Sequence, residues 1–138
     1  MRNNSEAGPT PLSAEELRAY PPLVLAWVGD AVFDLMVRRH LIKSGMRRMN
    51  ELHREAVSIV CAESQAAILH RFNQQGVLSE EEADIVRRGR NSATRAPRRA
   101  TPQEYNHSTG FEALLGWLWL RGDEARLEQL IALALAPE

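Results

Sequence analysis

The chain is poor in cysteine, in long apolar runs and in net charge, and each shortage excludes a class of protein. Its one cysteine, Cys61, cannot form an internal disulfide, so we expect a reducing compartment, the cytoplasm, and no cysteine-based metal site. No uncharged apolar run reaches the roughly 18 residues of a membrane span, which argues against a membrane partner. The formal net charge of −1 argues against a generally basic nucleic-acid coat protein, but not against a local basic patch.

The sequence also lacks strand-like alternation and internal repeats, so it predicts an all-α fold, a helical bundle. Residues 1–12 are polar and are expected to be a disordered tail, followed by one domain over residues 13–138. Ser13 and Ser79 each stand three residues before a glutamate, which is the capping-box pattern of a helix start. Helices are expected from Ser13 to about Tyr20, Pro22 to about Lys43, Asn50 to about Asn73, Ser79 to about Gly89, about Ser108 to Leu120, and around Leu127 to Ala134.

Residues 23–42 are apolar almost throughout, except for Asp30, Asp34 and Arg38, which recur every four residues on one helical stripe. A helix of this kind is typical of the centre of a helical bundle. Two interpretations of the stripe remain open. Asp34 and Arg38 can form an ordinary ion pair while Asp30 is hydrogen-bonded to a helix end, or a bound cation can compensate Asp30.

Glu112 is a second lone carboxylate in an apolar helix. Ala26 lies one turn before Asp30 and Gly116 one turn after Glu112, so two small side chains would let the helices approach and the carboxylates converge. Converging carboxylates repel unless they are protonated or bridged by a cation, and hard oxygen ligands suit Mg²⁺ or Mn²⁺. A salt bridge from Glu112 to an arginine of the neighbouring loop is the alternative.

Residues 87–99 contain six arginines and no acid, and the later part lacks apolar periodicity, so we expect a loop there. Loops of that length are usually functional or disordered. Bound Mg²⁺ beside an arginine-rich loop suggests phosphodiester chemistry, with the metal activating water and the loop holding phosphates. A solvated surface segment is the alternative interpretation. The arginines are Arg87, Arg88, Arg90, Arg95, Arg98 and Arg99.

Two motifs resemble those of the ribonuclease III family. Residues 26–32, Ala-Trp-Val-Gly-Asp-Ala-Val, resemble the signature motif of its catalytic domain, and residues 111–116, Phe-Glu-Ala-Leu-Leu-Gly, resemble its second acidic motif. Their order and spacing are closest to the Mini-ribonuclease III group, as are Gly-Arg-Asn at 89–91 and Ser-Thr-Gly-Phe-Glu at 108–112. That group lacks a double-stranded-RNA-binding domain, and the resemblance covers roughly residues 23–131.

The resemblance implies a homodimeric, Mg²⁺-dependent endoribonuclease, with Mn²⁺ as a possible substitute, that cuts double-stranded RNA to 5′-phosphate and 3′-hydroxyl ends. In some bacteria the family trims precursor 23S ribosomal RNA. Asp30 and Glu112 match its catalytic, metal-binding acids, whereas its other two acids fall at Ala26 and Thr109, a reduction that Mini-ribonuclease III shares. A non-catalytic RNA-binding or ribosome-assembly module with the same fold is the alternative, which the two missing acids favour.

The resemblance further implies that the helix carrying the signature motif packs against the same helix of a second subunit across a two-fold axis. Trp27 lies three residues before Asp30, beside the acidic stripe, so we expect it to anchor the dimer interface; a core tryptophan is the alternative. The six arginines are expected to contact the RNA backbone, and a duplex read mainly by shape implies modest sequence specificity. The roles of Tyr105 and His107, close to the second motif, stay open.

Overall fold

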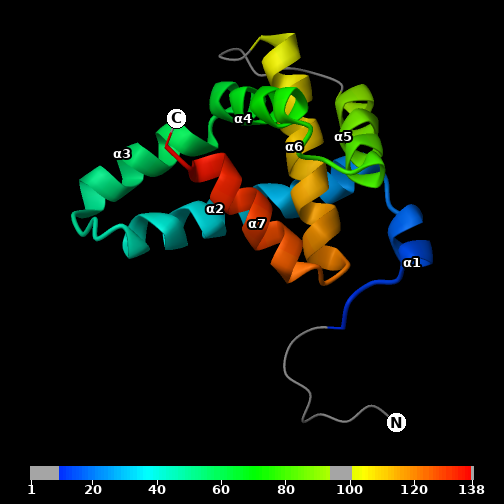
Figure 1. Cartoon of the computed structure of the whole chain (residues 1–138), viewed down its shortest axis with the longest axis horizontal. Helices are drawn as coiled ribbons and strands as arrows, with labels where there is room; N and C mark the ends of the chain where they lie inside the picture. The colour runs from blue at the N-terminus through cyan, green and yellow to red at the C-terminus, as the bar shows by residue number, and fades with distance from the viewer. Residues whose placement is uncertain (1–9, 94–100, 138) are drawn as a thin grey trace.

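The computed structural model describes residues 10–93 and 101–137, and every regular element in these ranges is a helix (Figure 1). The predicted all-α class is therefore confirmed. Most of the predicted tail lies outside the described residues, but the Leu12 amide donates to the Leu120 carbonyl at 2.8 Å. The helices are α1 (Ala14–Arg18), α2 (Pro22–Lys43), α3 (Met49–Val60), α4 (Ala62–Gln75), α5 (Glu80–Ser92), α6 (Pro102–Leu120) and α7 (Glu124–Leu135).

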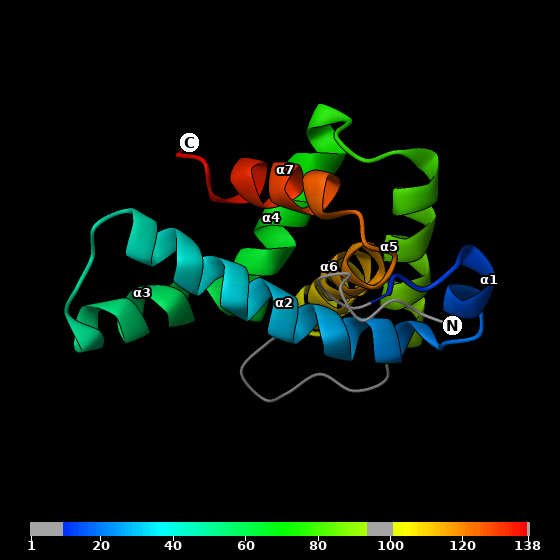
Figure 2. The same cartoon turned by 90° about the horizontal axis from the view of Figure 1, so that it is seen from below.

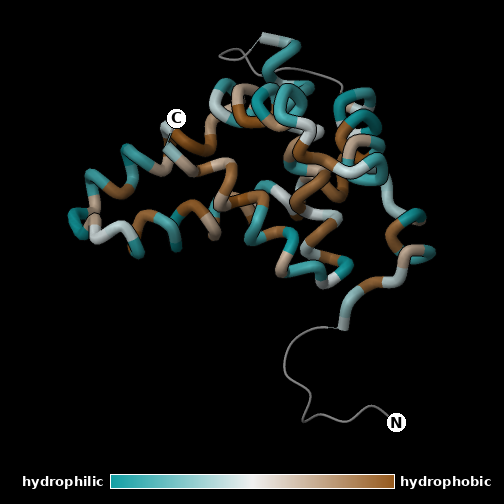
Figure 3. Tube along the Cα trace, viewed as in Figure 1, coloured by the Kyte–Doolittle hydropathy of each residue, from teal (hydrophilic) through white to brown (hydrophobic). Residues whose placement is uncertain are grey.

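Helix α6 occupies the middle of the bundle and packs against α2, α4, α5 and α7 (Figures 1 and 2). It is buried on most of its circumference, as expected for a helix without a continuous polar face. Hydrophobic residues gather along it in the middle of the molecule (Figure 3). The prediction that residues 23–42 form the central helix is thus wrong, because α2 crosses one side of α6 and leaves an apolar face exposed. Within the described residues, no helix combines the length and apolar character needed to cross a bilayer.

Three aromatic rings join the helices that build the site. Phe111 of α6 meets Phe33 of α2 edge-on, with ring centroids 5.2 Å apart, and Phe72 of α4 at 6.2 Å. All three side chains are fully buried. Such aromatic pairs add roughly 1 kcal/mol beyond the burial of their apolar area. This cluster fixes α2 and α4 against α6 at the level where the acidic motif begins.

Helix starts follow the capping chemistry of the sequence, including one that the apolar pattern did not reveal. The capping boxes predicted at Ser13 and Ser79 are both present. A third box at Thr101 opens α6 with Pro102 in its first turn, so the prediction of a start near Ser108 is wrong by about two turns. Helix α5 also continues to Ser92, past the expected end at Gly89. That glycine lies within the helix, where a Cβ would come within 2.9 Å of the Ala113 side chain of α6.

The single helix predicted from Asn50 to Asn73 is also wrong. It is divided at Cys61, whose backbone is extended (φ −67°, ψ 157°), into α3 and α4. Neither proline nor glycine marks this break in the sequence. The side-chain amide of Gln65 instead donates to the carbonyl of Val60, the last residue of α3, at 2.9 Å. The break therefore frees the Val60 carbonyl from helical hydrogen bonding, and the buried side chain of Gln65 bonds to it instead.

Candidate active site

Helices α2 and α6 cross with their backbones in contact because each has a glycine at the crossing. A Cβ at Gly29 would lie 1.7 Å from the carbonyl oxygen of Glu112, and a Cβ at Gly116 would lie 1.9 Å from that of Leu25. Neither position has room for a side chain. The sequence correctly predicted that Gly116 allows the close approach on α6. On α2 it predicted Ala26 as the small residue at the crossing, whereas Gly29 makes the contact.

This crossing brings the carboxyl groups of Asp30 and Glu112 together, as predicted. Burial raises the pKa of Glu112 from its usual 4.5 to about 8, helped by the hydrogen bond and the negative charge that Asp30 presents to it. Asp30 is exposed to solvent while Glu112 is partly buried. The two acids therefore form a close carboxyl pair that is open to solvent on one side.

Gln65 of α4 completes the surroundings of this pair. Its Nε2 donates to Glu112 Oε2 at 3.4 Å as well as to the Val60 carbonyl, and it lowers the pKa of Glu112 against the larger raising effects. Sequence reasoning missed this residue because a glutamine in an amphipathic helix suggests a solvated face. Its spacing from the buried residues Ile68, Leu69 and Phe72 places it on the apolar stripe, and this was the available signal.

The described residues give no support to a salt bridge at Glu112. Its polar neighbours there are Asp30 and Gln65, and no ion pair joins it to an arginine in the described ranges. The arginines of residues 94–100 lie outside those ranges. The ion pair predicted between Asp34 and Arg38 is present on the surface, with a separation of 3.2 Å.

A hard divalent cation fits this donor set. Two adjacent carboxyl groups repel when both are ionised, and a bound cation relieves that repulsion. The side-chain oxygen of Gln65 is buried without a hydrogen-bond partner among the described residues, which marks the neighbourhood as polar and incompletely satisfied. No group of three or more histidine, cysteine or acidic side chains that could hold a metal is found among those residues. The pair thus offers two carboxyl groups that could ligate a cation, those of Asp30 and Glu112.

The two positions at which the family's other acids would fall carry no ligand. Ala26 is buried against the core. The hydroxyl of Thr109 is buried and donates to the Tyr105 carbonyl of its own helix at 2.9 Å. Ring atom Nδ1 of His107 is likewise bonded within α6, to the Gln103 carbonyl at 2.7 Å. These contacts give Thr109 and His107 local structural partners.

The described arginines of α5 have different surroundings. Arg87 pairs with Asp84 of its own helix, whereas Arg90 is exposed and its side chain begins against Gly110 of α6. Arg88 lines a pocket elsewhere on the molecule. Their predicted contacts with RNA stay a prediction, and the others of the six lie outside the described residues: Arg95, Arg98 and Arg99.

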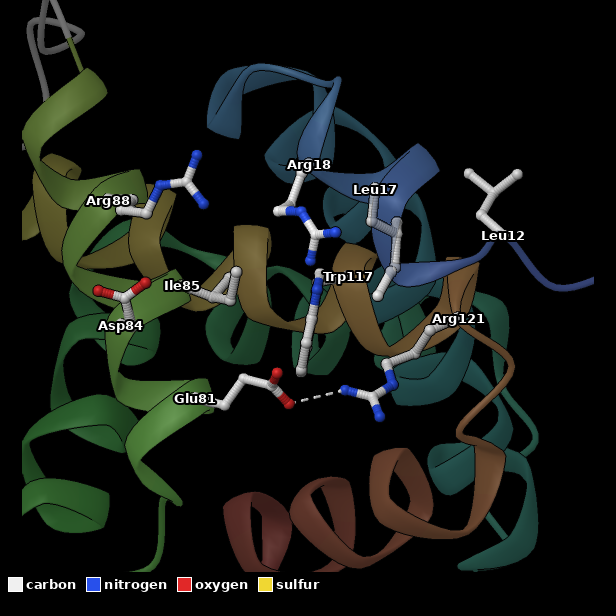
Figure 4. Close-up of a pocket in the computed structure, with 10 residues that line it drawn as sticks. Leu12, Leu17, Arg18, Glu81, Asp84, Ile85, Arg88, Trp117 and Arg121 are labelled. Atoms are coloured by element: carbon white, nitrogen blue, oxygen red, sulfur yellow. Dashed lines mark hydrogen bonds and ion pairs between the residues drawn. The ribbon is translucent and has the colours of Figure 1, made fainter.

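The pocket that includes Arg88 lies between α1, α5 and the end of α6 and measures about 360 Å³ (Figure 4). Arg121 stacks over the ring of Trp117 at 4.3 Å and pairs with Glu81 at 3.1 Å. Neither Asp30 nor Glu112 lines it. It is therefore separate from the carboxyl pair.

An apolar surface borders the carboxyl pair. Trp27 is 77% exposed and Leu35 is 65% exposed on α2, and Trp119 at the end of α6 is 42% exposed. With Asp30 and neighbouring residues they line a hollow of about 430 Å³. The interpretation of Trp27 as a core tryptophan is therefore wrong. Exposed apolar surfaces of this kind mark interaction sites.

Comparison with known proteins places this architecture in a family. Residues 23–123 match the Ribonuclease III domain family. The chain is 49% identical to a Mini-ribonuclease 3 of Symbiobacterium thermophilum, over 83% of this chain and 87% of that protein. It is 44% identical to a Mini-ribonuclease 3 of Synechocystis, over 93% and 87%. A crystal structure of a Fusobacterium nucleatum protein matches with a TM-score of 0.77 at 28% identity, covering 86% of this chain and 94% of that one.

The all-α fold, with one acid on each of two crossing helices, is that of a ribonuclease III domain, the catalytic unit of a class of endoribonucleases. Within that class, the chain belongs to the Mini-ribonuclease III family, as its two motifs predicted.

Proposed function

We propose that this protein hydrolyses double-stranded RNA in a divalent-metal-dependent reaction, with Asp30 and Glu112 as its catalytic residues. The observation that carries the proposal is the carboxyl pair that the glycine crossing of α2 and α6 brings together. Membership of a ribonuclease family gives this pair a reaction, the cleavage of a phosphodiester bond. The products are expected to carry 5′-phosphate and 3′-hydroxyl ends.

Asp30 and Glu112 would hold Mg²⁺, with Mn²⁺ as a substitute. When bound, such a cation lowers the pKa of water and stabilises the charge that develops on the leaving oxygen. The protein supplies orientation, because the backbones of α2 and α6 are in contact and fix the origin of both side chains. Exposed Asp30 lies where a phosphate can approach, and partly buried Glu112 holds the inner side.

The substrate we propose is duplex RNA, with precursor 23S ribosomal RNA in the cytoplasm as the natural target that the Mini-ribonuclease III family suggests. Guanidinium groups of residues 87–99 are the proposed contacts to phosphates. Duplex RNA is read mainly by its shape and by its phosphate and 2′-hydroxyl groups. The proposed specificity is accordingly modest.

A homodimer accounts for the exposed apolar surface of α2. Trp27, Leu35 and Trp119 expose large apolar side chains beside Asp30. A second copy of the chain related by a two-fold axis would cover the same patch on both subunits. Burial of an exposed tryptophan at the centre of such an interface is a typical anchor. The dimer would then carry one carboxyl pair per subunit beside the shared surface.

A non-catalytic RNA-binding module is the second candidate, favoured by Ala26 and Thr109 at the positions of the family's other acids. Incubation of the full chain with long duplex RNA, in Mg²⁺ or in EDTA, followed by gel electrophoresis, separates the two. The proposed enzyme shortens the RNA in Mg²⁺ alone. Binding in a mobility-shift assay without any shortening in Mg²⁺ would establish the non-catalytic module instead.

A further inference from the structure

Gln65 is anomalous among the buried residues of α4. It is 2% exposed and shares the buried stripe with Ile68, Leu69 and Phe72, yet it carries an amide. Its Oε1 is buried without a hydrogen-bond partner among the described residues. An unsatisfied buried acceptor costs about 1–3 kcal/mol, which offsets the hydrogen bond that the same amide donates to the Val60 carbonyl, so the fold gains little from a glutamine here.

The break between α3 and α4 determines which end of this amide faces Glu112. The Val60 carbonyl, at the end of α3, accepts a hydrogen bond from Gln65 Nε2 at 2.9 Å. In the flipped amide, two oxygens would face each other, so the carbonyl selects the observed orientation. Extended Cys61 makes this bond possible, because it ends α3 before α4 begins. A backbone group outside the carboxyl pair therefore holds the amide in place.

The same NH₂ group reaches Glu112 Oε2 at 3.4 Å. An amide has two N–H donors, so one can serve the Val60 carbonyl while the other points toward Glu112. A donor directed at a carboxylate favours its ionised form and restricts its rotation. Among the described residues, Gln65 and Asp30 are the side chains that form hydrogen bonds with Glu112, and only Gln65 brings a donor without a negative charge.

We propose that Gln65 is a positioning residue, which holds the Glu112 carboxylate in the orientation in which Glu112 and Asp30 together bind a divalent cation. The inference rests on the proposed function, because it takes these two acids as the metal ligands. Hydrogen-bond partners of metal ligands typically change metal affinity 10–100-fold when they are removed. Gln65 is buried and acts on the cation through Glu112.

Binding of Mn²⁺ to the metal-free full chain without RNA, followed by electron paramagnetic resonance, tests this role. Gln65→Met removes the amide while keeping the length of the side chain, and Gln65→Leu is a second apolar variant of similar volume. We expect each to bind Mn²⁺ about tenfold more weakly than the wild type. The midpoint of thermal unfolding should change little, because removal of the unsatisfied oxygen offsets the loss of the hydrogen bond to the Val60 carbonyl. Gln75→Met, at the exposed end of the same helix, is the matched control and should bind Mn²⁺ like the wild type.

Cleavage kinetics provide a second readout. At a fixed Mg²⁺ concentration, kcat of the Gln65 variants should fall while KM for duplex RNA stays unchanged, because Gln65 is buried away from RNA. Wild-type Mn²⁺ affinity in either folded Gln65 variant overturns the proposal, and so does a failure of both variants to fold, which would make Gln65 a structural residue. A wild-type chain that neither binds Mn²⁺ nor cuts duplex RNA would instead refute the proposed function, and the role of Gln65 with it.

Discussion

Gly29 of α2 faces the backbone of Glu112 of α6 so closely that a Cβ at residue 29 would lie 1.7 Å from the Glu112 carbonyl oxygen. Asp30, the next residue, therefore enters the site at the level of Glu112. The fold and the proposed chemistry depend on the same contact, since the separation of the two helices sets the separation of the two carboxyl groups.

Replacement of Gly29 by alanine should disturb both stability and cleavage. The added methyl group meets backbone, which cannot move aside as a flexible side chain would, so α2 and α6 must separate. We expect a loss of about 3 kcal/mol in the free energy of unfolding, measured with urea, and loss of RNA cleavage. Gly45→Ala is the control: its φ of 93° is unfavourable for alanine, at a cost of about 1 kcal/mol, but its Cβ meets no atom within 4 Å. That variant should still cut RNA, and wild-type behaviour of Gly29→Ala would show that the crossing tolerates separation.

The stability of the metal-free protein should depend on pH through Glu112. Burial, then the hydrogen bond and charge of Asp30, raise its pKa from 4.5 to about 8, so the folded protein keeps a proton that the unfolded chain releases. The free energy of unfolding should therefore fall as pH rises from about 4.5 to about 8, by up to roughly 5 kcal/mol, and level off above that range. Glu112→Gln lacks this proton, so its stability relative to the wild type should increase across the same window. Thermal unfolding in EDTA measures the difference, and a difference that is constant with pH would contradict the raised pKa.

The exposed surface around Trp27 should hold two copies of the chain together. Trp27→Ala removes the most exposed large apolar side chain of α2, so we expect a folded monomer in sedimentation analysis at concentrations where the wild type is a dimer. Met49→Ala, at the start of α3, removes a side chain of similar exposure from a different surface and should stay dimeric. A stable Trp27→Ala dimer would refute the anchor.

The arginine-rich segment should contribute through phosphate contacts, which depend on salt. Each contact gives a slope of about −0.9 in log K against log salt for duplex DNA, and we expect a similar value for RNA. Replacing Arg95, Arg98 and Arg99 by alanine should make the slope shallower by roughly 3 for each engaged segment. Arg39→Ala is the control, because Arg39 pairs with Glu128 outside the arginine-rich segment and its loss should leave the slope unchanged. Saturating RNA should largely restore the cleavage rate of the triple variant, whereas an unchanged slope and affinity would reject the RNA-binding role.

Sequence patterns predicted the helices that carry the acids, because capping boxes and lone carboxylates in apolar segments have a direct physical meaning. They did not predict the break at Cys61, where neither glycine nor proline interrupts the helical pattern. They placed the start of α6 too late, because its first two turns lack apolar periodicity and only Thr101 and Pro102 mark it. The exposed apolar face of α2 looked like core, since a pattern of apolar residues cannot distinguish an intramolecular contact from an intermolecular one.

The role of Gln65 at the candidate site was likewise not predictable from the sequence. Its contact with Glu112 joins residues 47 positions apart in the chain, and it exists only because α3 ends at Val60. A single sequence shows that Gln65 falls on an apolar stripe but not which group it meets. Helical periodicity and capping signals therefore cannot predict a tertiary contact that depends on an irregular break in the backbone.

Single-turnover cleavage of duplex RNA by Asp30→Asn and Glu112→Gln tests the central claim most directly. Both variants keep the shape of the side chain and remove the repulsion between the two carboxylates, so their thermal stability should equal or exceed that of the wild type. Their cleavage rates in Mg²⁺ should fall below about one hundredth of the wild-type rate. Asp34→Asn, on the same stripe but paired with Arg38 at the surface, should cut RNA normally. Cleavage near the wild-type rate by either Asp30→Asn or Glu112→Gln would contradict the assignment of this pair as the active site.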